Sequence, residues 1–169
     1  MEEEKEVRPH LRYTPEEIKR IVEEEVEGTV KEYGGVPKGW IGFDLDGTLA
    51  IYDDWNSIDH IGEPMPLTVA LAAEYLKQGF RLKIMTARYA GVGVLDLFTG
   101  KKLTEEDISG PIQAWCKKHI GEELPVTNKK DFQMIKLYDD RAVSVKRNDG
   151  ALKHWDEPLP AHLLEKPDK

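Results

Sequence analysis

The sequence predicts an α/β protein built on a mostly parallel sheet with helices on both of its faces. Short apolar runs alternate along the chain with segments whose apolar residues recur every three or four positions, which are the patterns of strands and amphipathic helices. Strands that alternate with helices favour parallel pairing, and helices then cover the sheet. The length of 169 residues favours a single domain with a proper core.

The N-terminal region is expected to hold a flexible end followed by a long helix. Residues 1–13 carry few apolar side chains, so we expect them to fray. Thr14 suits the N-cap, Pro15 the first turn and Glu17 the third position of a capping box, and a pair of glycines ends the pattern. The helix predicted over 14–35 has one apolar stripe, which should pack on the domain or on a second copy, so it could support a homo-oligomer.

The remaining elements follow from the same patterns. The expected strands are Trp40–Asp44, Phe80–Thr86, Leu124–Thr127, Met134–Tyr138 and Ala142–Val145. The expected helices are Met65–Leu76, which Gly79 ends, and Ile112–Ile120. Residues 89–103 are expected to be irregular, Asn148–Gly150 to form a turn, and 151–169 to form an extended tail.

Composition restricts the classes of protein that need to be considered. No apolar run approaches the length of a membrane span, and the polar N-terminus lacks the features of a signal peptide. The single cysteine, Cys116, excludes an internal disulfide and is expected to be a buried packing residue. We therefore expect a cytoplasmic protein with no membrane partner. The net charge of −8 argues against loose electrostatic binding of nucleic acid.

Two aspartates directly follow the first apolar strand and are the most informative feature of the chain. Asp44 and Asp46 are two residues apart, so in an extended segment their side chains share a face. Carboxylates that close repel each other unless a cation lies between them. Gly47 permits a tight turn, and Thr48 offers a hydroxyl and an amide to an anion. This combination is typical of phosphoryl-transfer sites.

Three more polar clusters follow later strands of the predicted sheet. They are Thr86-Ala87-Arg88, Lys129-Lys130 and Asp139-Asp140-Arg141. Each cluster alone has an ordinary explanation as turn, cap or surface residues. In parallel sheets, however, ligands bind outside the carboxyl ends of the strands, and all four clusters fall at such ends. The sequence therefore predicts one site at this edge.

In these motifs the chain resembles the haloacid dehalogenase-like hydrolase superfamily. The residues that carry the resemblance are Asp44-Leu45-Asp46-Gly47-Thr48, Thr86, Lys130 and Asp139-Asp140, within residues 40–148. Thr127-Asn128-Lys129-Lys130 and Tyr138-Asp139-Asp140-Arg141-Ala142-Val143 look similar to signatures of small phage and bacterial members of that superfamily. The resemblance implies a Rossmann-like catalytic domain over 36–150. The intervals 50–64 and 89–103 are too short for a folded cap, which implies a nearly capless enzyme.

The resemblance also implies roles for the motif residues. Asp44 would attack phosphorus, and Asp46 would act as general acid and base. Mg²⁺ would be held by Asp44, by the backbone carbonyl of Asp46 and by Asp139 or Asp140, with Asp140 favoured. Thr86 would bind a phosphoryl oxygen. Either Lys129 or Lys130 would neutralise charge, and the signature favours Lys130.

Four further residues are candidate substrate ligands: Thr48, Arg88, Asn128 and His60. All of them except Thr48 have an alternative role. Arg88, like Arg141, could instead pair with acidic surface residues, and Asn128 could cap a turn. His60 could line the pocket mouth with Trp55 and Asn56, or belong to a loop held by its own turns. The scattered histidines lack ligand spacing, which argues against zinc.

The function expected from these features is that of a Mg²⁺-dependent phosphomonoesterase. A nucleotide or another small phosphate ester is the favoured substrate, because the negative charge opposes polyanion binding. A polynucleotide end is the enzymatic alternative. A phosphate-binding or scaffold domain without catalysis is the alternative from another class, although such a module has no need of both Asp44 and Asp46.

Overall fold

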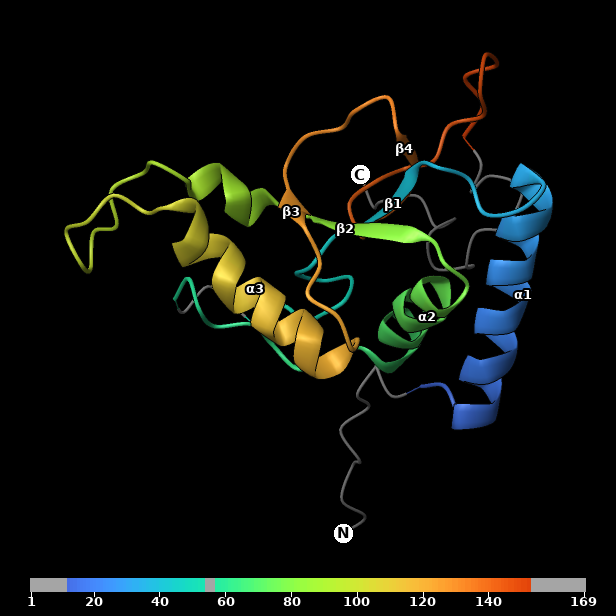
Figure 1. The fold of residues 1–169 in the computed structure, drawn as a ribbon, viewed down its shortest axis with the longest axis horizontal. Helices are drawn as coiled ribbons and strands as arrows, with labels where there is room; N and C mark the ends of the chain where they lie inside the picture. Colours follow the sequence, from blue (N-terminus) through green and yellow to red (C-terminus); the bar gives the residue numbers. More distant parts are fainter. Residues whose placement is uncertain (1–11, 54–56, 153–169) are drawn as a thin grey trace, which may run out of the picture.

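The computed structural model describes residues 12–53 and 57–152 and shows an α/β fold around one sheet (Figure 1). The sheet has four parallel strands in the order β3-β2-β1-β4. The strands are β1 (Trp40–Phe43), β2 (Arg81–Met85), β3 (Val126–Thr127) and β4 (Met134–Tyr138). The helices are α1 (Pro15–Tyr33), α2 (Pro66–Lys77), α3 (Glu105–His119) and the short 3₁₀ helix η2 (Ala87–Gly91). The predicted α/β class and parallel sheet are confirmed.

The three α-helices pack on one face of the sheet. Ile41 and Phe43 of the central strand β1 join a core with residues of α2 and α3. Phe43 stacks on Tyr138 of β4 with ring centres 4.7 Å apart, and it meets Tyr75 of α2 edge-on at 6.4 Å. The α1 residue Thr29 shares a hydrogen bond of 2.7 Å with the same Tyr75. Figure 1 shows α2 and α3 below the strands and α1 beside them at the right of the view. For residues 12–53 and 57–152, the expected helices on both faces are therefore wrong.

Within the described residues, the second face lacks an α-helix because of the way in which β3 connects to β4. The chain crosses from one edge strand to the other through residues 128–133, whereas a helical crossover needs about a dozen residues or more. Asp131 in this loop accepts hydrogen bonds from Trp40 Nε1 at 2.8 Å and from Lys83 Nζ at 3.5 Å. Figure 1 shows the loop on the side opposite the helices. A short loop thus covers Trp40, which is fully buried.

The predicted N-terminal helix is confirmed, and its capping explains where it begins. The Thr14 hydroxyl accepts a hydrogen bond from the amide of Glu17 at 3.2 Å, and the Glu17 carboxylate accepts one from the amide of Thr14 at 2.7 Å. Val22 and Val26 of its apolar stripe are buried in the common core. The stripe therefore packs on its own domain, and a homo-oligomer through this helix stays a prediction.

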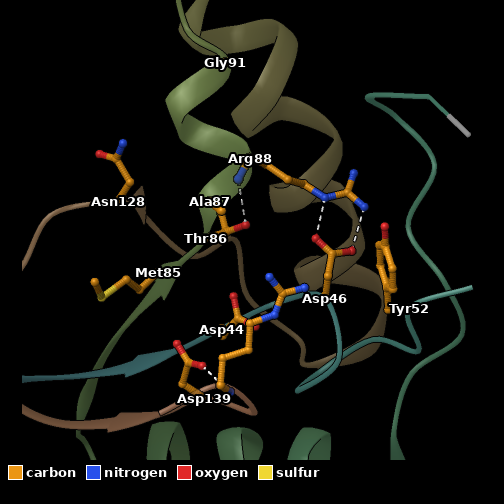
Figure 2. Close-up of a pocket in the computed structure, with 11 residues that line it drawn as sticks. Asp44, Asp46, Tyr52, Met85, Thr86, Ala87, Arg88, Gly91, Asn128 and Asp139 are labelled. Carbon is orange, nitrogen blue, oxygen red and sulfur yellow. Dashed lines mark hydrogen bonds and ion pairs between the residues drawn. The ribbon is translucent and has the colours of Figure 1, made fainter. Parts of the chain in front are cut away.

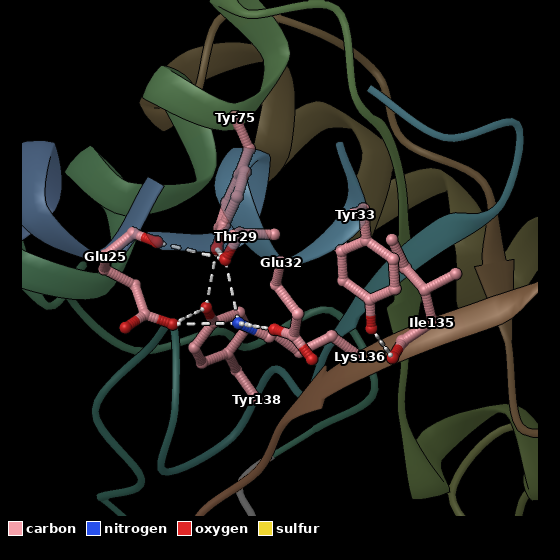
Figure 3. A network of polar contacts seen from close by, with 8 residues as sticks. All are labelled: Glu25, Thr29, Glu32, Tyr33, Tyr75, Ile135, Lys136 and Tyr138. Carbon is pink, nitrogen blue, oxygen red and sulfur yellow. Dashed lines mark hydrogen bonds and ion pairs between the residues drawn. The ribbon is translucent and has the colours of Figure 1, made fainter. Parts of the chain in front are cut away.

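A polar network joins α1 to α2 and β4 (Figure 3). Tyr138 donates a hydrogen bond to the Glu25 carboxylate and shares one of 2.8 Å with Tyr75. Lys136 Nζ donates to Glu25 at 3.2 Å and to the Thr29 hydroxyl at 2.8 Å. Burial favours protonated Glu25, but the hydrogen bond from Tyr138 and the charge of Lys136 outweigh it, so the pKa of Glu25 lies below its ordinary value. The network fixes α1 against β4.

The helix predicted over Ile112–Ile120 is longer than expected. It begins at Glu105, after a second capping box in which the Thr104 hydroxyl accepts from the amide of Asp107 at 3.2 Å and the Asp107 carboxylate accepts from the amide of Thr104 at 2.7 Å. Ile108 is fully buried and extends the apolar stripe towards the N-terminus. The helix continues through a proline in its interior.

The strand predicted over Ala142–Val145 is not formed. Val145 makes only an isolated bridge with Leu152, across the predicted turn Asn148–Gly150, which the structure confirms. β4 is an edge strand, and no strand pairs with its outer side in the described part of the chain. Val143 and Val145 are accordingly more than half exposed. The high β-propensity of the two valines does not produce a strand here, because no neighbouring strand in the described residues pairs with this segment.

The segment between η2 and α3 contains a projecting hairpin. Leu95 and Lys102 form an antiparallel bridge, and the amide of Asp96 donates to the carbonyl of Lys101 at 2.8 Å. Leu97 and Phe98 at its tip are 89% and 92% exposed. Part of the segment expected to be irregular, residues 89–103, is therefore ordered by backbone hydrogen bonds.

Some sequence predictions concern residues outside the described ranges. The expected flexible end over 1–13 and the extended tail over 151–169 fall largely in this group, as do Trp55 and Asn56. None of the helices formed by the described residues combines the length and apolar character that a membrane crossing requires.

Candidate active site

Three aspartates from two paired strands meet at the carboxyl end of the sheet. Asp44 follows β1, and Asp139 and Asp140 follow β4. The amide of Asp44 donates to the carbonyl of Tyr138 at 2.9 Å, so the two strands stay in register up to the acids. One carboxylate oxygen of each aspartate lies within 4.8 Å of the others. The parallel pairing of β1 with β4 therefore gathers acids that are far apart in the sequence.

The surroundings of Asp44 destabilise its negative charge. Burial disfavours the ionised form of Asp44, and the charge of Asp139 and a hydrogen bond with Asp140 add to this effect, which raises the pKa of Asp44 to about 7. An all-oxygen donor set of this kind suits a hard divalent cation. Asp44, Asp139 and Asp140 could therefore hold such an ion, although these donors do not distinguish Mg²⁺ from other hard cations.

Gly47 allows the carboxylate of Asp140 to approach the turn after β1. Its φ of +87° is a left-handed conformation that favours glycine. A Cβ atom at this position would lie 2.7 Å from Asp140 Oδ2, so a side chain here would force the Asp140 carboxylate to shift. Both the backbone conformation and the acid that packs against it therefore favour glycine.

Thr48 lies behind the aspartates and does not line the pocket. Its hydroxyl accepts a hydrogen bond from the amide of Asp140 at 3.1 Å and lies 3.4 Å from carboxylate oxygens of Asp44 and Asp140. Its amide donates to the carbonyl of Leu45 at 3.3 Å. The Thr48 hydroxyl thus connects two of the acids, and the predicted role of Thr48 as an anion ligand stays a prediction.

Asp46 keeps its carboxylate out of the three-aspartate cluster and pairs with Arg88 instead (Figure 2). Arg88 Nε and Nη2 donate to the two carboxylate oxygens of Asp46, each at 2.7 Å. The arginine side chain is 6% exposed and that of Asp46 19%. Of the two roles considered for Arg88, the structure shows an ion pair, but with a motif acid and not with a surface residue. Direct substrate binding by Arg88 stays a prediction.

A pocket of about 640 Å³ opens in front of these groups. Thr86, at the end of β2, is 3% exposed and caps η2 by accepting a hydrogen bond from the amide of Arg88 at 3.2 Å. The amide of Thr86 donates to the carbonyl of Thr127 at 2.9 Å, which brings Asn128 to the same edge. The lining residues are Asp44, Asp46, Tyr52, Met85, Thr86, Ala87, Arg88, Gly91, Asn128, Asp139 and Arg141.

Two further candidate residues lie outside this pocket lining, as Thr48 and Asp140 do. Lys130 is exposed and does not line the pocket, and the amide of its neighbour Lys129 donates to the Thr127 hydroxyl at 3.1 Å. His60 pairs with Asp53 at 2.9 Å and does not line the pocket either. The catalytic role of Lys130 and the substrate role of His60 therefore stay predictions.

Two lining residues with large side chains, Met85 and Tyr52, were absent from the sequence-based candidates. Met85 is the last residue of β2, so its position directly before Thr86 at a strand end could have identified it. Tyr52 follows the turn after β1 and is 51% exposed, and no local pattern marks it. Together they add apolar and aromatic surface beside a polar site. A ligand with an unsaturated or apolar portion would fit such a lining.

Comparisons of the chain with protein-family models, with curated proteins and with solved structures found no match.

Proposed function

We propose that the protein is a phosphomonoesterase that depends on a divalent cation, Mg²⁺ in the first place, and acts through an aspartyl-phosphate. Its substrate class is a nucleotide or another small phosphate ester, and its fold is of the haloacid dehalogenase type. One observation carries the proposal: Asp44, Asp139 and Asp140 converge at strand ends, beside a pocket that Asp44 and Asp139 line together with Thr86 and Asp46. Phosphoryl transfer requires acids that hold a cation, a hydroxyl that can bind a phosphoryl oxygen and a separate carboxylate for proton transfer.

The first displacement would use Asp44 as the nucleophile. An Asp44 oxygen would form a bond to phosphorus while the bond from phosphorus to the ester oxygen breaks, and Asp46 would give a proton to that leaving oxygen. In the second displacement, Asp46 would take a proton from water, whose oxygen would bond to phosphorus as the bond to Asp44 breaks. The sum is ester plus water to alcohol plus phosphate, with Asp44 and Asp46 returned to their starting states.

The cation would be held by Asp44, Asp139 and Asp140. When bound, it would supply positive charge that favours ionised Asp44 and offsets the charge of the phosphoryl oxygens. The Thr86 hydroxyl accepts from the amide of Arg88, so its own proton is directed elsewhere and suits a phosphoryl oxygen in the pocket. The side chain of Lys130 would have to move to the pocket to add its charge.

The volume of the pocket favours a small substrate. Sites for small molecules typically occupy about 300–1,000 Å³, and this pocket holds about 640 Å³. Tyr52, Met85 and Asn128 line it together with the acids, and they offer stacking, apolar and amide contacts. These groups suit the base or sugar of a nucleotide better than a bare phosphate.

The test is hydrolysis of p-nitrophenyl phosphate by the purified protein with Mg²⁺. We expect EDTA to abolish turnover and Asp44→Asn to lower kcat by about 1000-fold or more, because the nucleophile is lost. Asp149→Asn is the matched control: Asp149 is an exposed aspartate paired with Lys146, outside the pocket lining, and its replacement should leave kcat unchanged.

Two further measurements make the test decisive. Quenched reactions with ³²P-labelled substrate should leave label on the wild-type protein and none on Asp44→Asn. A panel of nucleoside monophosphates, sugar phosphates and phosphorylated oligonucleotides then identifies the substrate class. Unchanged turnover in Asp44→Asn would remove the covalent mechanism, and a preference for oligonucleotides that weakens steeply with salt would replace the small substrate by a nucleic-acid end.

A further inference from the structure

We propose that Arg88 is a positioning residue for Asp46: it holds the Asp46 carboxylate in one orientation and does not bind the substrate phosphate itself. The inference rests on the proposed function, in which Asp46 is the general acid and base. Arg88 would thus have a role different from that of a phosphate ligand. Its contacts would explain why the Asp46 carboxylate, which lies beside the pocket, keeps one orientation.

The contacts of Arg88 are those of a bidentate, desolvated pair. Nε and Nη2 each donate to a different oxygen of Asp46, both at 2.7 Å. Nη1 donates to the carbonyl of Ile58 at 3.1 Å. Parallel charge-assisted hydrogen bonds fix the angle of a carboxylate as well as its distance, and burial strengthens them. Asp46 therefore cannot rotate about its side-chain bonds without breaking at least one of the two bonds.

The backbone around Arg88 makes this clamp rigid. Arg88 is the second residue of η2, and its amide donates to the hydroxyl of Thr86, which is buried. Its guanidinium reaches the turn after β1 at Asp46 and the chain at Ile58. One side chain thus joins three segments that are distant in sequence. Figure 2 shows Arg88 extending from η2 to Asp46, on the far side of Asp46 from Asp139.

The same geometry argues against direct phosphate binding by Arg88. A phosphate ligand presents its bidentate N–H pair to the substrate, whereas Nε and Nη2 of Arg88 are directed at Asp46. The three-aspartate cluster that would hold the cation contains neither residue of this pair. A change at Arg88 should therefore alter how Asp46 works and leave substrate and cation binding in place.

A double-mutant cycle tests this role. Arg88→Met and Arg88→Lys are made in the wild-type protein and in Asp46→Asn, and kcat, KM and cation affinity are measured. We expect Arg88→Met to lower kcat by about 10- to 100-fold, as for a misplaced catalytic group, and KM to change by less than about twofold. In the Asp46→Asn background the same change should cost nothing further, because Arg88 acts through Asp46.

Lysine at position 88 and a distant arginine serve as controls. Arg88→Lys keeps the charge but cannot form two parallel bonds, so it should recover only part of kcat. Arg81→Met removes an arginine that bonds the carbonyl of Lys38 outside the pocket lining, and it should leave kcat unchanged. Thermal melting verifies that each variant is folded at the assay temperature; if Arg88→Met is not, Arg88→Lys carries the cycle.

Several results would overturn the proposal. Losses that multiply in the double variant, together with a raised KM, would make Arg88 an independent substrate ligand. A lowered melting temperature with unchanged kcat would make the pair merely structural. Failure of the proposed function can be distinguished from failure of this inference, because it would appear as full activity in Asp44→Asn. Even then, the ¹⁵N signal of Arg88 Nε–H should shift in Asp46→Asn but not in Asp149→Asn, and no shift would refute the pairing.

Discussion

Tyr138, the last residue of β4, donates a hydrogen bond to Glu25 of α1 (Figure 3). The next two residues along the chain are Asp139 and Asp140, which form two thirds of the acidic cluster. The N-terminal helix therefore holds the strand that delivers these acids. It belongs to the same packed unit as the candidate site and is not an appendage to it.

Tyr138→Phe should destabilise the fold. The change removes a hydroxyl that bonds both Glu25 and Tyr75 and leaves these partners partly unsatisfied, at a cost of about 1–3 kcal/mol in the free energy of unfolding. Urea denaturation followed by fluorescence measures it. Tyr52→Phe removes the hydroxyl of a half-exposed tyrosine and should change the free energy by less than about 0.5 kcal/mol. Equal effects of the two changes would mean that the network contributes nothing.

The stability of the metal-free protein should fall as the pH rises towards neutrality. Burial and the neighbouring acids raise the pKa of Asp44 from 3.8 to about 7, so the folded state holds this proton more tightly than the unfolded state. Its contribution is fully present below about pH 4 and is lost as the pH rises through about 7. Urea titrations in EDTA at several pH values should show this loss in the wild type. The curve of Asp44→Asn should lie flatter over the same range, and parallel curves would contradict the assignment to Asp44.

A divalent cation should stabilise the folded protein through the aspartate cluster. A ligand that binds only the native state at a hundred times its Kd adds about 2.7 kcal/mol, so Mg²⁺ should raise the melting temperature in a concentration-dependent way. Asp140→Asn and Asp44→Asn should remove most of that rise, because each takes a ligand from the site. Asp149→Asn, changed at an exposed ion pair, should keep it. A rise that survives in Asp140→Asn would place the cation elsewhere.

Cys116 should be unreactive in the native protein. It is fully buried on α3, and burial raises the pKa of its thiol to about 12, so almost no thiolate is present at pH 8. Iodoacetamide should label it only after unfolding in urea, and the extent of labelling should follow the loss of native fluorescence. Rapid labelling without denaturant would show that α3 opens locally.

The second capping box can be tested at Thr104. Thr104→Ala removes the hydroxyl that accepts from the amide of Asp107, and N-cap losses of this kind cost about 1 kcal/mol. Thr104→Ser keeps the hydroxyl and should restore most of the stability in thermal or urea unfolding. If alanine and serine behave alike, the start of α3 is held by packing of Ile108 alone.

The same residues show where sequence reasoning succeeds and where it stops. The start of α1 could be predicted because Thr14, Pro15 and Glu17 act within one turn of the chain. The start of α3 was missed because Ser109-Gly110-Pro111 suggests a break, although the capping box at Thr104 has the same form with aspartate in place of glutamate. At the start of α3 the local sequence signals conflict, and burial of the apolar stripe of α3 determines where the helix begins.

Long-range features of the site were only partly open to prediction. Parallel strands bring their ends together, so the approach of Asp44 to Asp140 follows from strand order. The pairing of Asp46 with Arg88 depends on side-chain rotamers across 42 positions of sequence, which no local pattern encodes. The absence of a second helix layer from the described part of the chain was hard to predict for a similar reason, since the effect of the short crossover after β3 depends on the strand order.

Gly47 carries no side chain, yet its position is restricted by a positive φ and by a nearby carboxylate oxygen of Asp140. An exhaustive mutational survey should find this position intolerant even of alanine. A side chain at position 47 would displace the carboxylate of Asp140. The site would then lose its geometry although none of its polar residues had been replaced.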